Sequence, residues 1–165
     1  MSKKETISRL VDKYQSDIVK VNDTVWGFAE PGMKEYKTAE FYESFFKEKG
    51  FKVSSGLADM PTAFIAEWGS GKPVVGFLGE FDALPTLSQE AACPEKKPIV
   101  PGAYGQGCGH NSLGAGAAGA AMAFRDYLEE NHLSGTVRFY GCPGEEYGSG
   151  KVFMARAGLY DDLDV

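Results

Sequence analysis

The sequence predicts an α/β domain of layered architecture, in which helices cover a β-sheet. Segments with strand-like patterns alternate with segments of helical periodicity, which is the order typical of this fold class. One apolar run, residues 73–85, is nearly continuous, as expected for a strand covered on both faces. The chain has 165 residues, of which 43% are hydrophobic, so that one domain can bury a substantial core.

The N-terminal part of the chain predicts two helices. Over residues 5–28, apolar side chains recur at three- and four-residue steps with charges between them, which predicts an amphipathic helix. Pro31 and Gly32 then break the pattern. A second helix is predicted with Thr38 as its N-cap and Gly50 as its C-terminal stop. Its buried side is expected to carry four aromatic residues: Phe41, Tyr42, Phe45 and Phe46.

Three strands are predicted next, "FKVSS" (51–55), "TAFIAEWG" (62–69) and "PVVGFLGEFDALP" (73–85). The turn "GSGK" joins the second strand to the third. The third strand ends in two acids, Glu80 and Asp82. Acids at the C-terminal edge of a buried strand lie where open α/β sheets place their binding sites.

The rest of the chain predicts a long loop, a helix, a strand and a further helix. Residues 86–109 are irregular and contain three prolines, and a loop of this length is usually functional or mobile. Residues 112–132, "SLGAGAAGAAMAFRDYLEENH", predict a helix whose first half consists of small residues. Residues 135–143, "GTVRFYGCP", predict a strand, and residues 145–159 turn and begin the last helix.

Composition excludes several classes of partner. The net charge of −6 and the lack of a basic cluster argue against a nucleic-acid surface. The sequence has no run of about 20 apolar residues, which a membrane helix needs, and no secretory signal at its N-terminus. The three cysteines are an odd number in a chain without an export signal, which predicts a reduced, cytoplasmic setting.

A glycine-rich stretch, "GQGCGHNSLGAGAAGAAM", permits two interpretations. Gly114, Gly116 and Gly119 have the spacing of a dinucleotide-binding turn. That turn requires a strand directly before it and an acid at the end of the next strand, and the chain has neither. The glycines and alanines are therefore expected to let the helix pack closely against its neighbours. Such packing must offset a cost of up to about 1 kcal/mol for each helical glycine.

The second interpretation is a metal site. Cys108 and His110 alone would favour an incidental pair, but two further clusters stand at predicted strand ends. One consists of the acids that end the third strand, and the other of Glu145 and Glu146 after the fourth. Thiolate, imidazole and carboxylate suit zinc, and the last two also suit manganese. One of the adjacent glutamates could bind the metal while the other takes a proton from water, and Asp82 could orient a ligand.

The motifs "GEFDALP…GCGHN…GCPGEEYGSGKVFMARAGL" resemble the metal-dependent aminoacylase and carboxypeptidase family. They are most similar to its amidohydrolase branch, which includes the p-aminobenzoyl-glutamate hydrolases and the indole-acetyl-amino-acid hydrolases. The resemblance implies a layered α/β/α zinc-peptidase-like catalytic domain. It also implies a homo-oligomer that uses two divalent ions, zinc or manganese, to hydrolyse amide bonds in N-acyl amino acids or small peptides.

The resemblance also implies roles for individual residues. Cys108, His110 and Glu146 match the metal ligands, and Glu145 matches the general base. Asp82 matches the acid that supports the metal centre. The sequence departs from the family pattern at Asn111, where relatives commonly have Asp, and at Glu80, where related branches carry His or Asp.

Family members are longer than this chain. We therefore expect residues 1–165 to be the N-terminal part of the catalytic domain, without the lid domain and the later ligand histidines. We also expect this chain alone to be a poor hydrolase. His132 is expected at the solvated end of the long helix, away from the site. The alternative function is a non-catalytic folded module that binds a metal or a partner without turnover.

Overall fold

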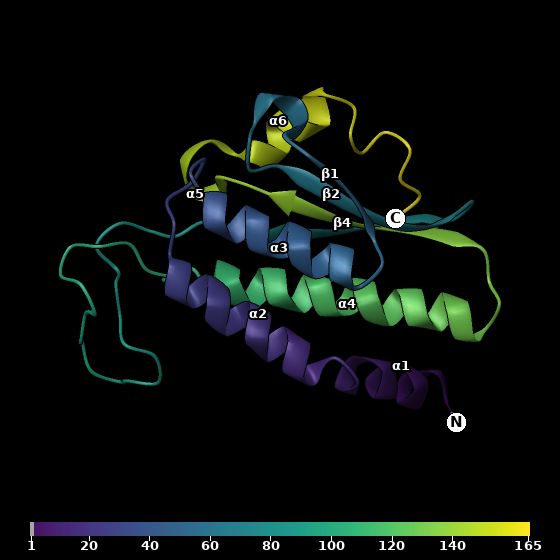
Figure 1. The fold of residues 1–165 in the computed structure, drawn as a ribbon, viewed down its shortest axis with the longest axis horizontal. Coiled ribbons are helices and arrows are strands. Elements are labelled where there is room, and N and C mark those ends of the chain that lie inside the picture. Colours follow the sequence, from purple (N-terminus) through teal and green to yellow (C-terminus); the bar gives the residue numbers. More distant parts are fainter. Residues whose placement is uncertain (1) are drawn as a thin grey trace.

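The structure, a computed structural model, describes residues 2–165 and consists of one mixed β-sheet with helices on both faces (Figure 1). The helices are α1 (Lys3–Asp12), α2 (Gln15–Phe28), α3 (Tyr36–Glu48), the 3₁₀ turn η1 (Leu57–Asp59), α4 (His110–Glu130), α5 (Glu145–Gly148) and α6 (Gly150–Arg156). The strands are β1 (Lys52–Ser55), β2 (Phe64–Ser70), β3 (Val74–Glu80) and β4 (Gly135–Cys142). None of the helices in the described part of the chain is long and apolar enough to cross a membrane.

The order of the strands places two parallel strands side by side. The order is β1-β2-β4-β3, in which β4 is antiparallel to β2 and parallel to β3. The long loop and α4 connect β3 to β4. Because the two strands run in the same direction, their C-terminal residues, Glu80 and Cys142, are register partners.

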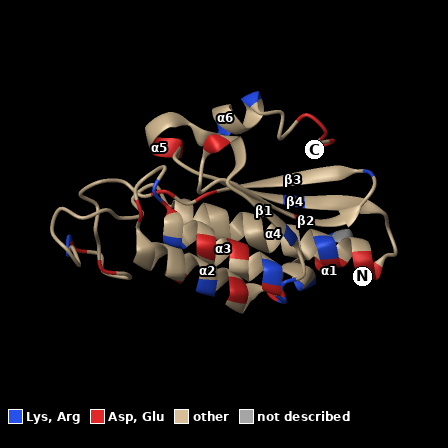
Figure 2. Cartoon of the chain, turned by 45° about the horizontal axis from the view of Figure 1, so that its top comes forward, with Lys and Arg blue, Asp and Glu red and all other residues tan. Residues whose placement is uncertain are grey.

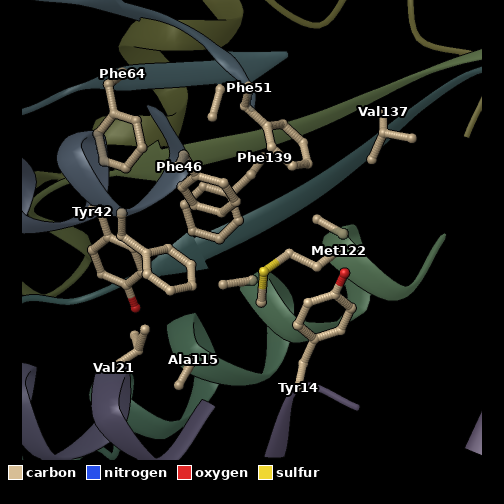
Figure 3. Close-up of a cluster of buried hydrophobic side chains, with 14 of the residues drawn as sticks. Tyr14, Val21, Tyr42, Phe46, Phe51, Phe64, Ala115, Met122, Val137 and Phe139 are labelled. Atoms are coloured by element: carbon tan, nitrogen blue, oxygen red, sulfur yellow. The ribbon is translucent and has the colours of Figure 1, made fainter. Parts of the chain in front are cut away.

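Each face of the sheet has its own hydrophobic core, which confirms the layered α/β prediction. Helices α3 and α4 cover one face, with α1 and α2 packed outside them, and Tyr42, Phe46 and Phe139 form a dense aromatic cluster there (Figure 3). The ring centroids of Phe46 and Phe139 are 4.6 Å apart. On the other face, α6 and the C-terminal residues pack on a smaller core around Tyr140 and Met154.

The helix predicted over residues 5–28 is wrong in one respect, because it is two helices. The break lies at Lys13 and Tyr14, between α1 and α2. Both side chains bind the carboxylate of Asp126 on α4, at 2.6 Å from Lys13 Nζ and 2.7 Å from Tyr14 Oη. These hydrogen bonds attach the chain to α4 at the break between α1 and α2. The apolar periodicity of the sequence gives no sign of them, so it could not predict the break.

The predicted N-cap of the second helix, Thr38, is also wrong. Helix α3 begins at Tyr36, with Glu35 in the N-cap position. The carboxylate of Glu30 accepts the backbone N–H groups of Lys37, at 3.1 Å, and Thr38, at 2.9 Å. Glu30, which lies outside the helix, therefore accepts hydrogen bonds from first-turn N–H groups. The side chain of the N-cap residue usually accepts these bonds.

Gly50 ends α3 as predicted. It has a left-handed φ of +84° and donates its N–H to Lys47 O at 3.0 Å. The N–H of Phe51 donates to Phe46 O at 2.9 Å, and the rings of these two residues pack against each other. Both bonds together form a Schellman motif, in which glycine is favoured because it has no Cβ.

The expectation that the third strand is covered on both faces holds only in part, because Leu78 stays exposed. β3 is an edge strand in residues 2–165, and Leu78 is 39% exposed. On its outer side only the start of the strand is bonded, through Val74 and Gly76 to residues 164–165. The interior strands are β2 and β4, and nearly all residues of β4 are buried. Continuous hydrophobicity therefore did not distinguish this edge strand from an interior strand, because strand order depends on the crossover.

Most of the small residues of α4 pack against their neighbours, as predicted, whereas Gly116 is exposed. Gly114, Gly116 and Gly119 lie inside the helix rather than in a turn that follows a strand, so they do not form a dinucleotide-binding loop. A Cβ at Gly114 would lie 2.6 Å from both Glu80 O and Tyr42 Oη. At Gly114 the backbone of α4 therefore comes close to the end of β3.

We expect Gly114→Ala to destabilise the fold by about 1–3 kcal/mol, since the added methyl group meets a backbone oxygen that cannot move away. Gly116→Ala is the matched control, because Gly116 lies on the same helix, is exposed and has nothing within 4 Å of the position that a Cβ would take. There alanine should stabilise the helix by up to about 1 kcal/mol. Urea unfolding measures both free energies, and equal effects of the two changes would contradict the close packing.

Candidate metal centre

The candidate site lies at one end of the sheet, where three segments meet. Glu80 ends β3 and Asp82 follows it, His110 begins α4, and Glu145 and Glu146 begin α5 directly after β4. The parallel pairing of β3 and β4 brings both strand ends together, and α4 starts beside them. Figure 2 shows the acidic start of α5 at this end of the molecule.

His110 is held by Asp82. Their side chains are 3% and 1% exposed, and His110 Nδ1 lies 2.8 Å from Asp82 Oδ1 and 3.2 Å from Asp82 O. Both neighbours of Nδ1 are acceptors, which assigns a proton to Nδ1, so that in the neutral imidazole the lone pair is on Nε2. The other carboxylate oxygen of Asp82 accepts the backbone N–H of Glu146 at 2.9 Å. Asp82 thus connects His110 to α5.

The hydrogen bonds of this pair shift both pKa values in the expected directions. The hydrogen bond to Asp82 raises the pKa of His110 above its ordinary value, although burial opposes the shift. Burial alone would raise the pKa of Asp82, but the hydrogen bonds from His110 and from the Glu146 N–H outweigh it and lower the pKa. Asp82 is therefore a carboxylate at neutral pH.

Three carboxylates surround the free nitrogen of His110. Its Nε2 lies 3.2 Å from Glu80 Oε2, 3.7 Å from Glu145 Oε2 and 3.8 Å from Glu146 Oε1. Two sets of potential ligand atoms lie within 4.8 Å of one another, Cys108–His110–Glu146 and Glu80–His110–Glu145. The ammonium group of Lys151 forms an ion pair with the carboxylate of Glu80. Like charges this close favour a bound cation.

The chemistry of these donors fits a metal ion. Glu146 Oε1 is buried and has no hydrogen-bond partner within residues 2–165. A buried carboxylate oxygen without a partner costs free energy, which a cation beside it would offset. The adjacent carboxylate of Glu146 is the main cause that raises the pKa of the Cys108 thiol, and a cation would favour the thiolate instead. Sulfur, nitrogen and oxygen together suit zinc, and nitrogen with oxygen suits manganese.

The structure thus brings together every residue that the sequence singled out for the site. Cys108, His110 and Glu146 converge, Glu145 stands beside them, and Asp82 supports His110. Their roles as ligands and general base stay predictions, since the geometry shows proximity alone. Lys151 was missed, because a lone lysine after a turn carries no sequence signal of its partner.

Two further residues lie outside the cluster. Asn111, where the family pattern has Asp, turns away to α2, and its Nδ2 donates to Asn22 Oδ1 at 2.8 Å. His132 is exposed just beyond the far end of α4, as predicted. Among residues 2–165, His110 is therefore the histidine that the site uses.

Comparison with known proteins agrees with this geometry. Residues 76–165 match the family model "Peptidase family M20/M25/M40". The chain is 49% identical to one of the subunits of p-aminobenzoyl-glutamate hydrolase from Escherichia coli over 144 residues, which are 87% of this chain and 30% of that protein. It is 30% identical to the N-acyl-L-amino acid amidohydrolase of Geobacillus stearothermophilus, over 98% of this chain and 43% of that protein.

Solved structures show the same fold. A dinuclear metal binding peptidase from the M20 family, YXEP of Bacillus subtilis, superposes with a TM-score of 0.70 at 22% identity, over 92% of this chain and 42% of that chain. Human carnosine dipeptidase 1 superposes with a TM-score of 0.62 at 14% identity, over 97% of this chain and 39% of that chain. The chain thus spans well under half the length of these relatives.

Proposed function

Because the chain belongs to peptidase family M20/M25/M40, we propose that it forms part of a two-metal centre that hydrolyses amide bonds in N-acyl amino acids or small peptides. Relatives named for p-aminobenzoyl-glutamate hydrolysis, Xaa-Arg dipeptide cleavage and N-acyl amino acid hydrolysis support this substrate class. The observation that carries the proposal is the arrangement around His110 Nε2, which faces three carboxylates, one with an unpartnered buried oxygen.

Cys108, His110 and Glu146 would hold a divalent ion, with Glu80 available to the second cluster. When bound, two zinc or manganese ions would supply the Lewis acidity that activates a water molecule and polarises the amide carbonyl. Asp82 would keep the proton of His110 on Nδ1 and so keep Nε2 directed at the site.

We assign the role of general base to Glu145. Its side chain is 41% exposed, whereas that of Glu146 is 19% exposed and carries the buried oxygen. The more exposed carboxylate would be accessible to both the attacking water and a substrate. It would take the proton of the water and then give it to the departing amine. The two adjacent glutamates thus differ in environment, which permits different roles.

Calorimetric titration with Zn²⁺ or Mn²⁺ tests the metal site in this chain, and a panel of N-acyl amino acids tests hydrolysis in a protein of the relatives' length that contains it. We expect saturable binding that a chelator reverses, and turnover that requires the metal. Binding without turnover in the longer protein would favour the alternative, a non-catalytic module. Absence of binding would contradict the proposal.

A further inference from the structure

A short segment between α2 and α3, residues 30–35, contacts both halves of the candidate site. The backbone oxygen of Glu30 accepts the N–H of Ala83 at 2.9 Å, next to Asp82. At the other end of the segment, Glu35 Oε1 accepts the N–H of Gly144 at 2.7 Å, next to Glu145. The segment "EPGMKE" therefore bonds to the chain on either side of the site, although its sequence predicts only a helix break.

Glu35 is an unusual residue for the interior. Its side chain is fully buried, and its second oxygen accepts the hydroxyl of Thr62 at 2.9 Å. Within residues 2–165 no cationic side chain forms an ion pair with it. Burial raises its pKa, although the hydrogen bonds that it accepts oppose that shift. A carboxyl group here costs more than an apolar residue would, so its hydrogen bonds must serve a positional need.

The backbone on both sides of this contact is closely packed. A Cβ at Gly32 would lie 3.1 Å from Gly144 Cα and 3.2 Å from Asp82 Oδ2. A Cβ at Gly144 would lie 2.7 Å from Met33 Cε. The turn before Glu145 therefore lies in close contact with residues 32–33, and the hydrogen bond to Glu35 ties it there.

Hydrogen bonds join residues 30–35, the end of β3 and the start of α5 into a closed ring. Glu30 bonds to Ala83, whose neighbour Asp82 accepts the N–H of Glu146 at 2.9 Å. Gly144, two residues before Glu146, bonds to Glu35, and residues 30–35 complete the ring. Because Asp82 also holds His110, one continuous network fixes the imidazole relative to the two glutamates.

We propose that Glu35 is a positioning residue, which by accepting the Gly144 N–H fixes the turn that presents Glu145 and Glu146 to His110. This inference rests on the proposed function for its consequence, but its structural basis is independent of any metal. The proposed role requires a hydrogen-bond acceptor on a side chain as long as that of glutamate. It does not require a negative charge.

Two variants separate reach from charge. Glu35→Gln keeps the length and an acceptor oxygen but removes the charge, while Glu35→Asp keeps the charge but is one methylene shorter. Thr62→Val is the matched control, because it removes the other hydrogen bond of Glu35 and leaves the bond to Gly144. Circular dichroism confirms that each variant is folded, and Glu35→Gln and Thr62→Val are close in shape to the original residues.

Two readouts are measured in the 165-residue chain. The first is hydrogen exchange of the Glu146 amide without metal, because that N–H donates to Asp82 only while the turn is in place. The second is Co²⁺ affinity, followed by the visible absorption of the ion. We expect Glu35→Asp to exchange at least about 10-fold faster and to bind Co²⁺ about 10- to 100-fold more weakly, as for residues that orient ligands. Glu35→Gln and Thr62→Val should stay within about 3-fold of the original chain.

The opposite order would overturn the inference: Glu35→Asp unchanged, or Glu35→Gln as impaired as Glu35→Asp, which would indicate a role of charge. An equal loss in Thr62→Val would indicate a general packing role and would also overturn it. If the original chain bound no Co²⁺, the proposed function would fail, while the amide exchange would still decide the role of Glu35.

Discussion

Replacing Glu145 with glutamine is expected to lower kcat for amide hydrolysis by about 10²- to 10⁴-fold, because glutamine cannot accept the proton of the attacking water. The metal held by Cys108, His110 and Glu146 should stay bound, since Glu145 is not part of that ligand set. The measurement is steady-state hydrolysis of an N-acyl amino acid by a protein of the relatives' length that contains this chain, with metal content determined in parallel.

Glu146→Gln is the matched comparison, because it makes the same chemical change at the adjacent position. It should weaken metal binding and lose activity together, since its Oε1 belongs to the ligand set with Cys108 and His110. If Glu145→Gln kept near-normal kcat while Glu146→Gln lost activity without losing metal, the two assignments would be reversed.

Replacing His110 with alanine is expected to weaken Zn²⁺ or Mn²⁺ binding by more than about 100-fold, beyond the 10- to 100-fold typical of residues that only orient ligands. His110 belongs to both potential ligand sets, so its loss affects each of them. It also removes the group that Asp82 holds, and leaves a buried carboxylate without its imidazole partner. Calorimetric titration of the chain measures the affinity.

His132→Ala is the control, because His132 is exposed at the far end of α4 and should not affect binding. Asp82→Asn should give an intermediate loss of about 10- to 100-fold, because an amide can present Nδ2–H to His110 and disturb its tautomer. Unchanged affinity in His110→Ala, with the fold intact, would show that the metal lies elsewhere.

Much of the fold could be predicted from the sequence, because local patterns report burial. The aromatic periodicity of residues 41–46 determined the buried side of α3, and Gly50 determined its end. The short apolar runs indicated all four strands, and the run of small residues indicated that α4 packs closely. The types of donor at Cys108, His110 and Glu146, each near a strand end or a helix start, were enough to indicate metal chemistry.

The tertiary structure alone decided how these parts are arranged. Parallel pairing of β3 with β4 brings Glu80 next to Cys142, 62 positions later in the chain, and so makes one site from three separate motifs. The break before α2 and the edge position of β3 depend likewise on partners distant in sequence.

The physical reason is that hydrophobic periodicity records which side of an element is buried, while a hydrogen bond depends on which partner the fold brings near. Glu35 shows the difference most clearly, since its contact with Gly144 spans 109 residues and leaves no pattern in the chain. The sequence by itself determined the elements and the donors. The tertiary structure decided how far apart the donors stand and which residues hold them there.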